Sequence, residues 1–323
     1  MSSSIRGSET ARVEPLLFDA TPLAESDTFL AEVPIDGNYA RRGRWRRLRR
    51  LPLPLLIGAV LVGTFVLVAV ASYIWTPHDP LKLVVVDRLL PPGSPGYVFG
   101  TDKFGRDVLS QLMVGARNSL YVSLLSTTVA IVVGGLLGLL TAGAGPRMRN
   151  ALSRLVDVGV ALPGILIALV LAASTGPGNR SAIFAIMFWF IPIVARVTIG
   201  PARQILALDY VEAAFAYGRS KWYVLLHHVT PNIAPLLTVL GSVMFAAAIL
   251  IEAALAFLGV GAQPPTASWG RLLQESQPLL EAAPTLMFFP GVAIMITVLG
   301  FNLLGDGLRT ILDPQQATRS GLL

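Results

Sequence analysis

Few residues in this chain are of the kinds that carry chemistry. It has no cysteine and three histidines, His78, His227 and His228. Neighbouring residues point to different faces of a helix, so His227 and His228 form a poor pair of metal ligands. The sequence contains no G-x-x-x-x-G-K-[ST] phosphate loop and no evident set of nucleophile and base. We therefore expect no metal site, no catalytic site and no ATP hydrolysis by such a loop.

Charged residues inside apolar stretches are the stronger candidates, because burying a charge in a membrane is costly and usually serves a function. Glu252 lies one to two turns from the end of an apolar stretch, where it could pair inside a helix bundle or face a wet pathway. Arg196 lies near the end of another stretch and could extend its guanidinium to the membrane surface. Asp157 begins a third stretch, where an acid suits a helix N-terminus.

These residues belong to a strongly apolar chain. Hydrophobic residues make up 54% of it and charged residues 14%, and the mean hydropathy is +0.66. A soluble domain carries about 25% charged residues. The apolar residues form six blocks, each long enough to span most or all of a hydrocarbon core of about 30 Å, at residues 51–77, 118–146, 158–179, 181–201, 229–257 and 282–305. The pattern predicts an all-α membrane protein with six transmembrane helices.

Positive charge predicts how these helices are oriented. Seven arginines lie between Arg41 and Arg50, directly before the first block, which places the N-terminus in the cytosol. Six spans return the C-terminus to the same side of an inner or plasma membrane. The expected organisation is an N-terminal arm at 1–50, a first transmembrane helix at 51–77, an extracytoplasmic segment at 78–116, a core of five transmembrane helices at 117–308 and a cytosolic tail at 309–323.

The longest cytosolic loop, from about 202 to 231, predicts a short helix outside the membrane. Asp209 is a good N-cap, and Glu212 follows three residues later, as in a capping box. Gly218 can take the left-handed conformation that ends such a helix. Ala213 and Ala214 present a nearly bare surface, so another protein could approach the backbone closely. An ordinary amphipathic linker at the membrane surface is the alternative.

A second helical stretch is expected from Lys221 to the Thr230-Pro231 pair. Its apolar residues recur at i, i+3, i+4 and i+7, which predicts one apolar face made of Trp222, Leu225, Leu226 and Val229.

The extracytoplasmic segment predicts a short helix of its own. Asp102 or Asp107 can cap it, and its apolar face would lie along the outer membrane surface and lead into the second span. A second outer loop, 261–284, contains Trp269, a residue typical of the membrane interface.

The cytosolic loop resembles the EAA loop of the permease subunits of bacterial ABC importers. The similarity rests on Glu212-Ala213-Ala214, then three residues and Gly218, and a proline at Pro231. The usual isoleucine and leucine before that proline are Val229 and Thr230 here. Three further stretches, FGTDKFGRDVLSQLMVGARNSL (99–120), AALAFLGVGAQPPTASWGRLL (253–273) and FNLLGDGLRTILDP (301–314), are similar to the C-type subunit of the dipeptide/oligopeptide branch. The resemblance covers about residues 50 to 314.

This resemblance implies a type I ABC importer permease fold that moves di- or oligopeptides across the inner membrane by alternating access. It implies four kinds of partner: a homologous second permease, two ATPase domains or subunits that bind ATP and magnesium, an extracytoplasmic substrate-binding protein and membrane lipids. Asp209, Glu212, Ala213, Ala214 and Gly218 would form the coupling helix that contacts an ATPase. Loop 261–284 could contact the binding protein. The chain itself would be a transport subunit, without enzymatic activity and without a cofactor.

Other functions remain open at this point. The same architecture could import nickel or another small solute. An ion-coupled secondary transporter is a weaker alternative, because it would need paired carboxylates or matching polar segments in two halves. The chain has one deep acid and no clear internal repeat. A membrane enzyme is weaker still.

Overall fold

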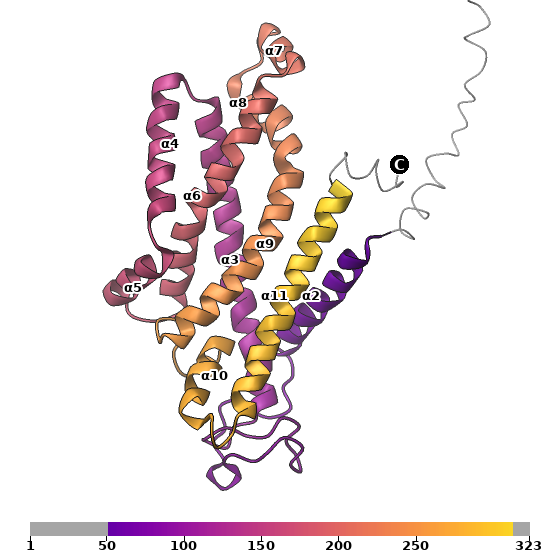
Figure 1. Ribbon diagram of the computed structural model, residues 1–323, viewed down its shortest axis with the longest axis vertical. Coiled ribbons are helices and arrows are strands. Elements are labelled where there is room, and N and C mark those ends of the chain that lie inside the picture. Colours follow the sequence, from indigo (N-terminus) through magenta and orange to yellow (C-terminus); the bar gives the residue numbers. More distant parts are fainter. Residues whose placement is uncertain (1–50, 313–323) are drawn as a thin grey trace, which may run out of the picture. The chain divides into compact units, whose positions relative to one another are not determined.

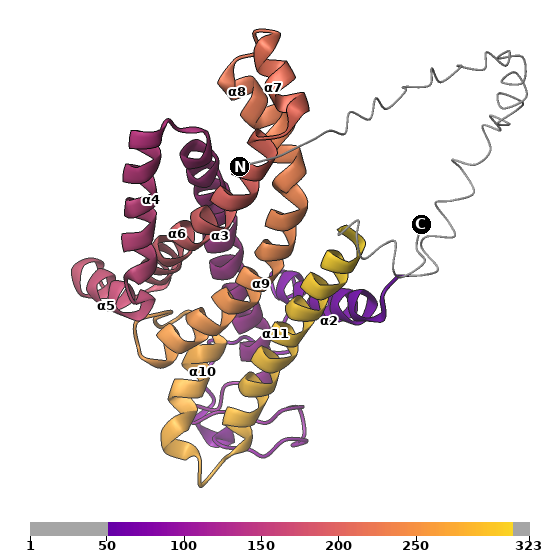
Figure 2. The same cartoon turned by 45° about the horizontal axis from the view of Figure 1, so that its top comes forward.

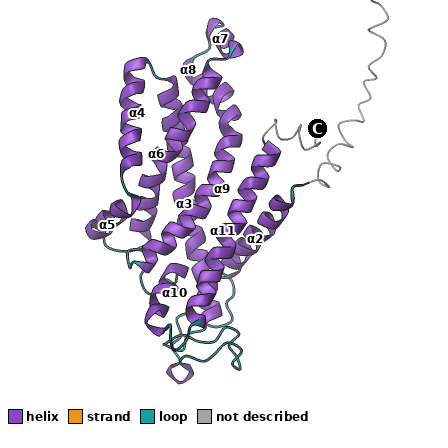
Figure 3. Cartoon of the chain, in the orientation of Figure 1, coloured by secondary structure: helices purple, strands orange, loops and turns teal. Residues whose placement is uncertain are grey.

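The structure is a computed structural model, and it describes residues 51–312. The described residues form helices joined by loops, without any strand (Figure 3). The helices, labelled as in Figure 1, are α2 (Leu53–Ala71), α3 (Val108–Gly143), α4 (Pro146–Ala161), α5 (Gly164–Thr175), α6 (Asn179–Leu206), α7 (Asp209–Ala216), α8 (Lys221–Val224), α9 (Thr230–Phe257), α10 (Trp269–Ser276) and α11 (Thr285–Leu312). The arm at 1–50 with its arginines, and most of the tail, lie outside the described residues.

Within residues 51–312, five apolar helices are long enough to cross a membrane: α2, α3, α6, α9 together with α8, and α11. A sixth span exists if α4 and α5 are counted as one, although they are bent by 82°. The break falls at Leu162-Pro163, because proline disfavours the helical conformation in the residue before it. The expected span at 158–179 is therefore not one straight helix.

The long helices form two groups joined by α9 (Figures 1 and 2). α3 lies along α6, and α2 lies along α11, while α9 contacts α3, α6 and α11. Small residues allow these close approaches: a Cβ on Gly138 would lie 2.8 Å from the carbonyl oxygen of Ala195, and one on Gly307 would lie 2.6 Å from the Cα of Leu55. Glycine at such contacts is typical of membrane helix packing.

The bundle has two different ends. α7 and α8 project from one end, and α10 and the long loop before α3 lie at the other (Figure 1). We call these the α7 end and the α10 end.

The helix that was expected to lie along the membrane surface is instead part of α3. Asp107 is the N-cap of α3, and its side chain accepts a hydrogen bond from the amide of Ser110 at 2.9 Å. Asp107 is one of the two residues that the sequence offered as caps. From there α3 continues without a break for 36 residues to Gly143. The prediction of a separate surface helix was wrong, because no proline or other helix-breaking turn separates Val108 from the apolar run that follows.

The loop before α3 is held by polar side chains. Asp102 Oδ1 accepts hydrogen bonds from the amides of Phe104 at 2.8 Å and Arg106 at 2.9 Å. The Tyr97 hydroxyl donates to Asp87 at 2.9 Å, and this charged acceptor raises the pKa of Tyr97. These bonds give the loop a defined shape beside α10.

Candidate functional site

The segment between α6 and α9 contains α7 and α8, and we call it the α7 loop. α7 begins at Asp209, and its N-cap is Leu208, whose carbonyl accepts the amides of Val211 at 2.9 Å and Glu212 at 3.2 Å. The predicted capping box of Asp209 with Glu212 was therefore wrong, because the cap position falls one residue earlier and no side chain caps it. Both acids lie in the first turn instead, where they suit the positive end of the helix dipole.

Gly218 ends this helix as the sequence predicts. Its φ is +76°, in the left-handed region that favours glycine. The amide of Gly218 donates to Phe215 at 2.9 Å, and the amide of Arg219 donates to Ala214 at 3.1 Å. The second helical stretch then starts at Lys221, as expected, with Ser220 capping the amide of Tyr223.

The loop is attached to the bundle through one fully buried residue of α7, Val211. Val211 packs in a cluster with residues of α3, α6, α8 and α9, among them Leu139, Ala202, Val224 and Ile233. Through Val211, α7 therefore packs against residues of three long helices.

The apolar face predicted for the second stretch is only partly buried. Leu225 and Val229 are buried, but Trp222 is 55% exposed and Leu226 is also exposed. The reason is a π-helical turn at Leu225–Val229, whose wider hydrogen-bond spacing rotates the chain out of the regular i, i+3, i+4 pattern.

The outer surface of the loop is unusually apolar for a segment at the end of a bundle. We call its exposed large side chains the α7 face: Leu208, Tyr210, Phe215, Tyr217, Trp222 and Leu226. Tyr217 is 88% exposed. Glu212 and Ala213 are exposed beside these residues, and within residues 51–312 the Glu212 carboxylate forms no ion pair or hydrogen bond. Aromatic residues are enriched at protein interfaces, and an exposed group of them is typical of an interaction site.

Arg196 lies deeper than the sequence suggested. α6 continues through Pro201 to Leu206, so Arg196 stands ten residues from the helix end. At a rise of 1.5 Å per residue this is about 15 Å from the end of α6. Arg196 forms an ion pair with Asp157 of α4, and the two side chains are 60% and 50% exposed. The sequence suggested that Arg196 could extend its guanidinium to the membrane surface, and it did not indicate this pairing with Asp157.

Glu252 is inside the bundle. It lies on α9 with 1% of its surface exposed, and its carboxylate accepts a hydrogen bond from the Ser119 hydroxyl of α3 at 2.9 Å. Its other oxygen has no protein partner among the described residues. Of the two roles open from sequence, pairing within the bundle agrees with this position.

Trp269, a residue type that suggested a membrane interface, is buried against α3. It is 4% exposed, and its indole nitrogen donates to the carbonyl of Leu112 at 3.0 Å. Because Trp269 begins α10, this bond fixes α10 against α3. Sequence reasoning missed this role, since the partner is 157 residues away.

Comparisons with known proteins agree with this architecture. Residues 111–318 match the family model of the binding-protein-dependent transport system inner membrane component. The chain is 35% identical to the dipeptide transport system permease protein DppC of Alkalihalophilus pseudofirmus, over 87% of this chain and 93% of that protein. It is 36% identical to the glutathione transport system permease protein GsiD of Pectobacterium atrosepticum, over 88% and 96%. It is 40% identical to a putative peptide transport system permease protein of Brucella suis, over 92% and 97%.

The fold is similar to a solved structure. A chain of the inward-facing MetNI methionine ABC transporter superposes with a TM-score of 0.55 at 19% identity, covering 62% of this chain and 96% of that one. At this sequence identity the structural similarity supports only the assignment of the fold.

Proposed function

The chain belongs to the family of binding-protein-dependent transport system inner membrane components, and from this we propose that it is the permease subunit of an ATP-driven importer of di- and oligopeptides. The observation that carries the proposal is the 35–40% identity, over most of both chains, to permeases of peptide, dipeptide and glutathione transport systems. The cargo would cross by alternating access, with the bundle open to one side of the membrane at a time.

We infer that the α7 end faces the cytosol. The arginines between Arg41 and Arg50 precede α2 directly, and positive residues next to a first span remain inside. In this orientation the arm at 1–50 and the tail at 309–323 are cytosolic, and the α10 end is extracytoplasmic. α11 itself extends beyond the expected boundary at 308, to Leu312.

The working assembly contains a second, homologous permease, two ATPase domains or subunits that bind ATP and magnesium, and an extracytoplasmic binding protein. The α7 face docks into an ATPase, with Asp209, Glu212, Ala213, Ala214 and Gly218 at the contact. Three features support this role: the exposed aromatic side chains, the unpaired Glu212 carboxylate and the small residues that permit close approach.

The anchoring of α7 supports a mechanical role. Because Val211 is buried between residues of α3, α6 and α9, movement of the ATPase surface is passed on to the spans instead of being lost in a flexible loop. Packed interfaces of this kind shift between discrete arrangements. ATP binding and hydrolysis in the partner would thereby bias the bundle between outward-open and inward-open states.

We place the Asp157–Arg196 pair on the route between this chain and the second permease. A charge at the centre of a bilayer costs about 2.5–3.5 kcal/mol on insertion scales, so half-exposed charges within a span are disfavoured against lipid. A wet surface satisfies both groups. Glu252, being buried, contributes to the bundle and not to this surface.

Charge reversal at the proposed dock tests the coupling role. Glu212→Lys should leave the protein in the membrane but lower peptide uptake into proteoliposomes about tenfold or more, because a docking contact worth about 1.4 kcal/mol is a factor of ten in occupancy. Glu281→Lys is the matched control, since Glu281 is also exposed but lies at the α10 end. Unimpaired uptake by Glu212→Lys would refute the assignment.

The cargo is tested on the partner binding protein. Its binding of peptides, nickel complexes and haem is compared by calorimetry. Failure to bind any peptide would rule out the peptide assignment while leaving the coupling role intact.

A further inference from the structure

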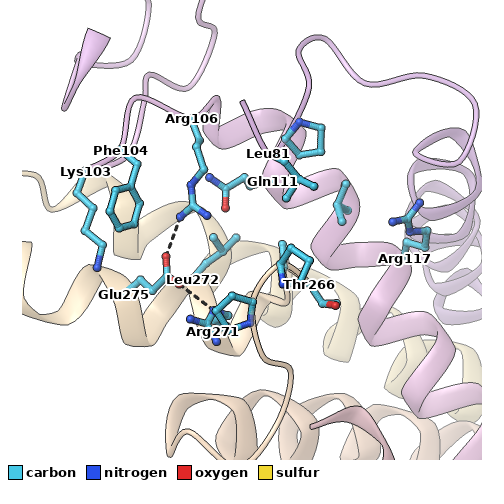
Figure 4. A pocket seen from close by; sticks show the side chains of 15 residues that line it. Leu81, Lys103, Phe104, Arg106, Gln111, Arg117, Thr266, Arg271, Leu272 and Glu275 are labelled. Carbon is cyan, nitrogen blue, oxygen red and sulfur yellow. Dashed lines mark hydrogen bonds and ion pairs between the residues drawn. The ribbon is translucent and has the colours of Figure 1, made fainter. Parts of the chain in front are cut away.

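A cavity of about 490 Å³ opens at the α10 end (Figure 4). Its walls come from three segments far apart in sequence: the loop at 80–81, the stretch at 103–117 that runs from the loop into the first turns of α3, and the stretch from Pro264 through α10. None of these walls belongs to the α7 face or to the Asp157–Arg196 pair. The cavity is therefore a separate feature of the molecule.

The cavity is lined by an excess of positive charge. Four cations, Lys103, Arg106, Arg117 and Arg271, share the lining with a single acid, Glu275. That acid is already engaged from both sides: Arg106 binds one of its oxygens at 2.8 Å and Arg271 binds the other at 2.8 Å. Arg106 also pairs with Asp102 at 2.6 Å, at the edge of the cavity. With both acids counted, two positive charges remain in excess.

The excess is carried by Lys103 and Arg117. Neither side chain forms an ion pair with a carboxylate in the described part of the chain. The Lys103 ammonium lies 5.0 Å from the ring of Phe104, and the Arg117 guanidinium lies 4.5 Å from the ring of Tyr73. Aromatic rings hold cations in place without neutralising them. Both residues are half-buried and line the cavity.

Hydrogen bonds and ion pairs hold the walls of the cavity in place. Arg271 is held by Glu275 and by the carbonyl of Ala262 at 3.2 Å. Ser268 caps the start of α10 at the amide of Arg271, and Trp269 ties the same turn to α3. Pre-organised walls lower the ordering cost of binding. The geometry is that of a formed receptor for anionic groups.

The position of the two free cations indicates what kind of anion fits. Figure 4 shows Lys103 and Arg117 at opposite sides of the cavity, with Glu275 and Arg271 between them. One terminal carboxylate of a small peptide can neutralise only one of them. A protein segment that bears two spaced carboxylates can neutralise both, and guanidinium and ammonium groups are the usual protein partners of carboxylates.

We propose that this cavity receives an acidic segment, bearing Asp or Glu side chains, of the extracytoplasmic binding protein. The proposal rests on the proposed function, which puts the α10 end on the side where that protein arrives. The cavity would steer the binding protein toward the permease and orient it there, because complementary charge raises association rates and fixes register at interfaces.

The test uses the assembled transporter in nanodiscs and its binding protein. The Lys103→Gln/Arg117→Gln double variant should associate about tenfold more slowly than wild type and lose most of its dependence on salt concentration. Lys82→Gln is the matched control, because Lys82 is an exposed cation of the same loop that does not line the cavity, and it should stay within about twofold of wild type. Unchanged association and salt dependence in the double variant would overturn the proposal.

A second measurement does not depend on charge. The chain has no cysteine, so a single Thr266→Cys at the cavity rim should form a disulfide with a cysteine placed in an acidic loop of the binding protein, while Gln204→Cys at the α7 end should not. Equal cross-linking from both positions would overturn the proposal.

Two further results separate this proposal from the proposed function. If free peptide binds the transporter without the binding protein and the double variant loses that binding, the carboxylate comes from the cargo and docking is the wrong assignment. If no binding protein associates with wild type, both proposals fail. If the double variant no longer associates with the binding protein but still binds the ATPase, the result supports the cavity assignment and does not bear on the coupling role.

Discussion

Gly218 offers a quantitative test of how the α7 loop works. It is the residue that turns the chain from α7 into α8, with φ at +76°. A Cβ at this position would meet no atom within 4 Å. Gly218→Ala therefore changes the backbone preference and nothing in the packing.

The expected cost follows from that conformation. An L-residue in the left-handed region costs about 1–2 kcal/mol, whereas asparagine tolerates the region better than alanine does. A cost of this size shifts the local equilibrium between formed and open α7 about 5–30-fold. Gly218→Ala should thus open α7 more often, Gly218→Asn should fall between alanine and wild type, and the spans should be unaffected.

Hydrogen exchange read by mass spectrometry checks this directly. Amides of α7 in Gly218→Ala should exchange about 5–30-fold faster than in wild type, with α3 and α9 unchanged. Gly200→Ala serves as control, because Gly200 lies within α6 with free space around it, and alanine there favours the helix by about 0.5–1 kcal/mol. Equal exchange in Gly218→Ala and wild type, or a larger effect from asparagine than from alanine, would refute the reasoning.

Two further predictions concern the buried and half-buried charges. Arg196→Asp alone places two acids together between α4 and α6 and should lower transport at least about tenfold, whereas the exchanged pair Asp157→Arg/Arg196→Asp should recover part of the uptake; a double variant no better than the single one would contradict the pairing. Glu252→Gln keeps an acceptor for the Ser119 hydroxyl, while Glu252→Ala leaves a cavity and an unpaired hydroxyl, at a cost of about 2–4 kcal/mol. Glu252→Ala should therefore lower the melting temperature of the purified complex more than Glu252→Gln, and equal melting temperatures would argue against the role of this hydrogen bond.

Much of the fold could be predicted because the decisive signals are local. Long blocks without charge lead to membrane-crossing helices wherever they occur, since a bilayer leaves the backbone no other way to satisfy its hydrogen bonds. The left-handed glycine at 218 and the start of the next helix at Lys221 also follow from neighbouring residues. The family resemblance rests on equally short motifs.

Local signals failed where a neighbouring segment decided the outcome. The cap of α7 fell on Leu208 and not on Asp209, because the turn leaving α6 sets where the helix begins. Trp222 is exposed because the π-helical turn after it changes the phase of the helix. The first turns of α3 belong to a span, because nothing breaks the helix after Asp107.

By itself, the sequence determined the number of apolar spans, apart from whether the bent pair α4–α5 counts as one. It also determined the position of the α7 loop and the family. Only the tertiary structure decided which charges meet. Asp157 and Arg196 lie 39 positions apart on different helices, Ser119 and Glu252 lie 133 apart, and the cavity at the α10 end joins three distant segments. The physical reason is that hydropathy and capping depend on a few consecutive residues, whereas the pairing and burial of a charge depend on which helices the whole bundle brings side by side.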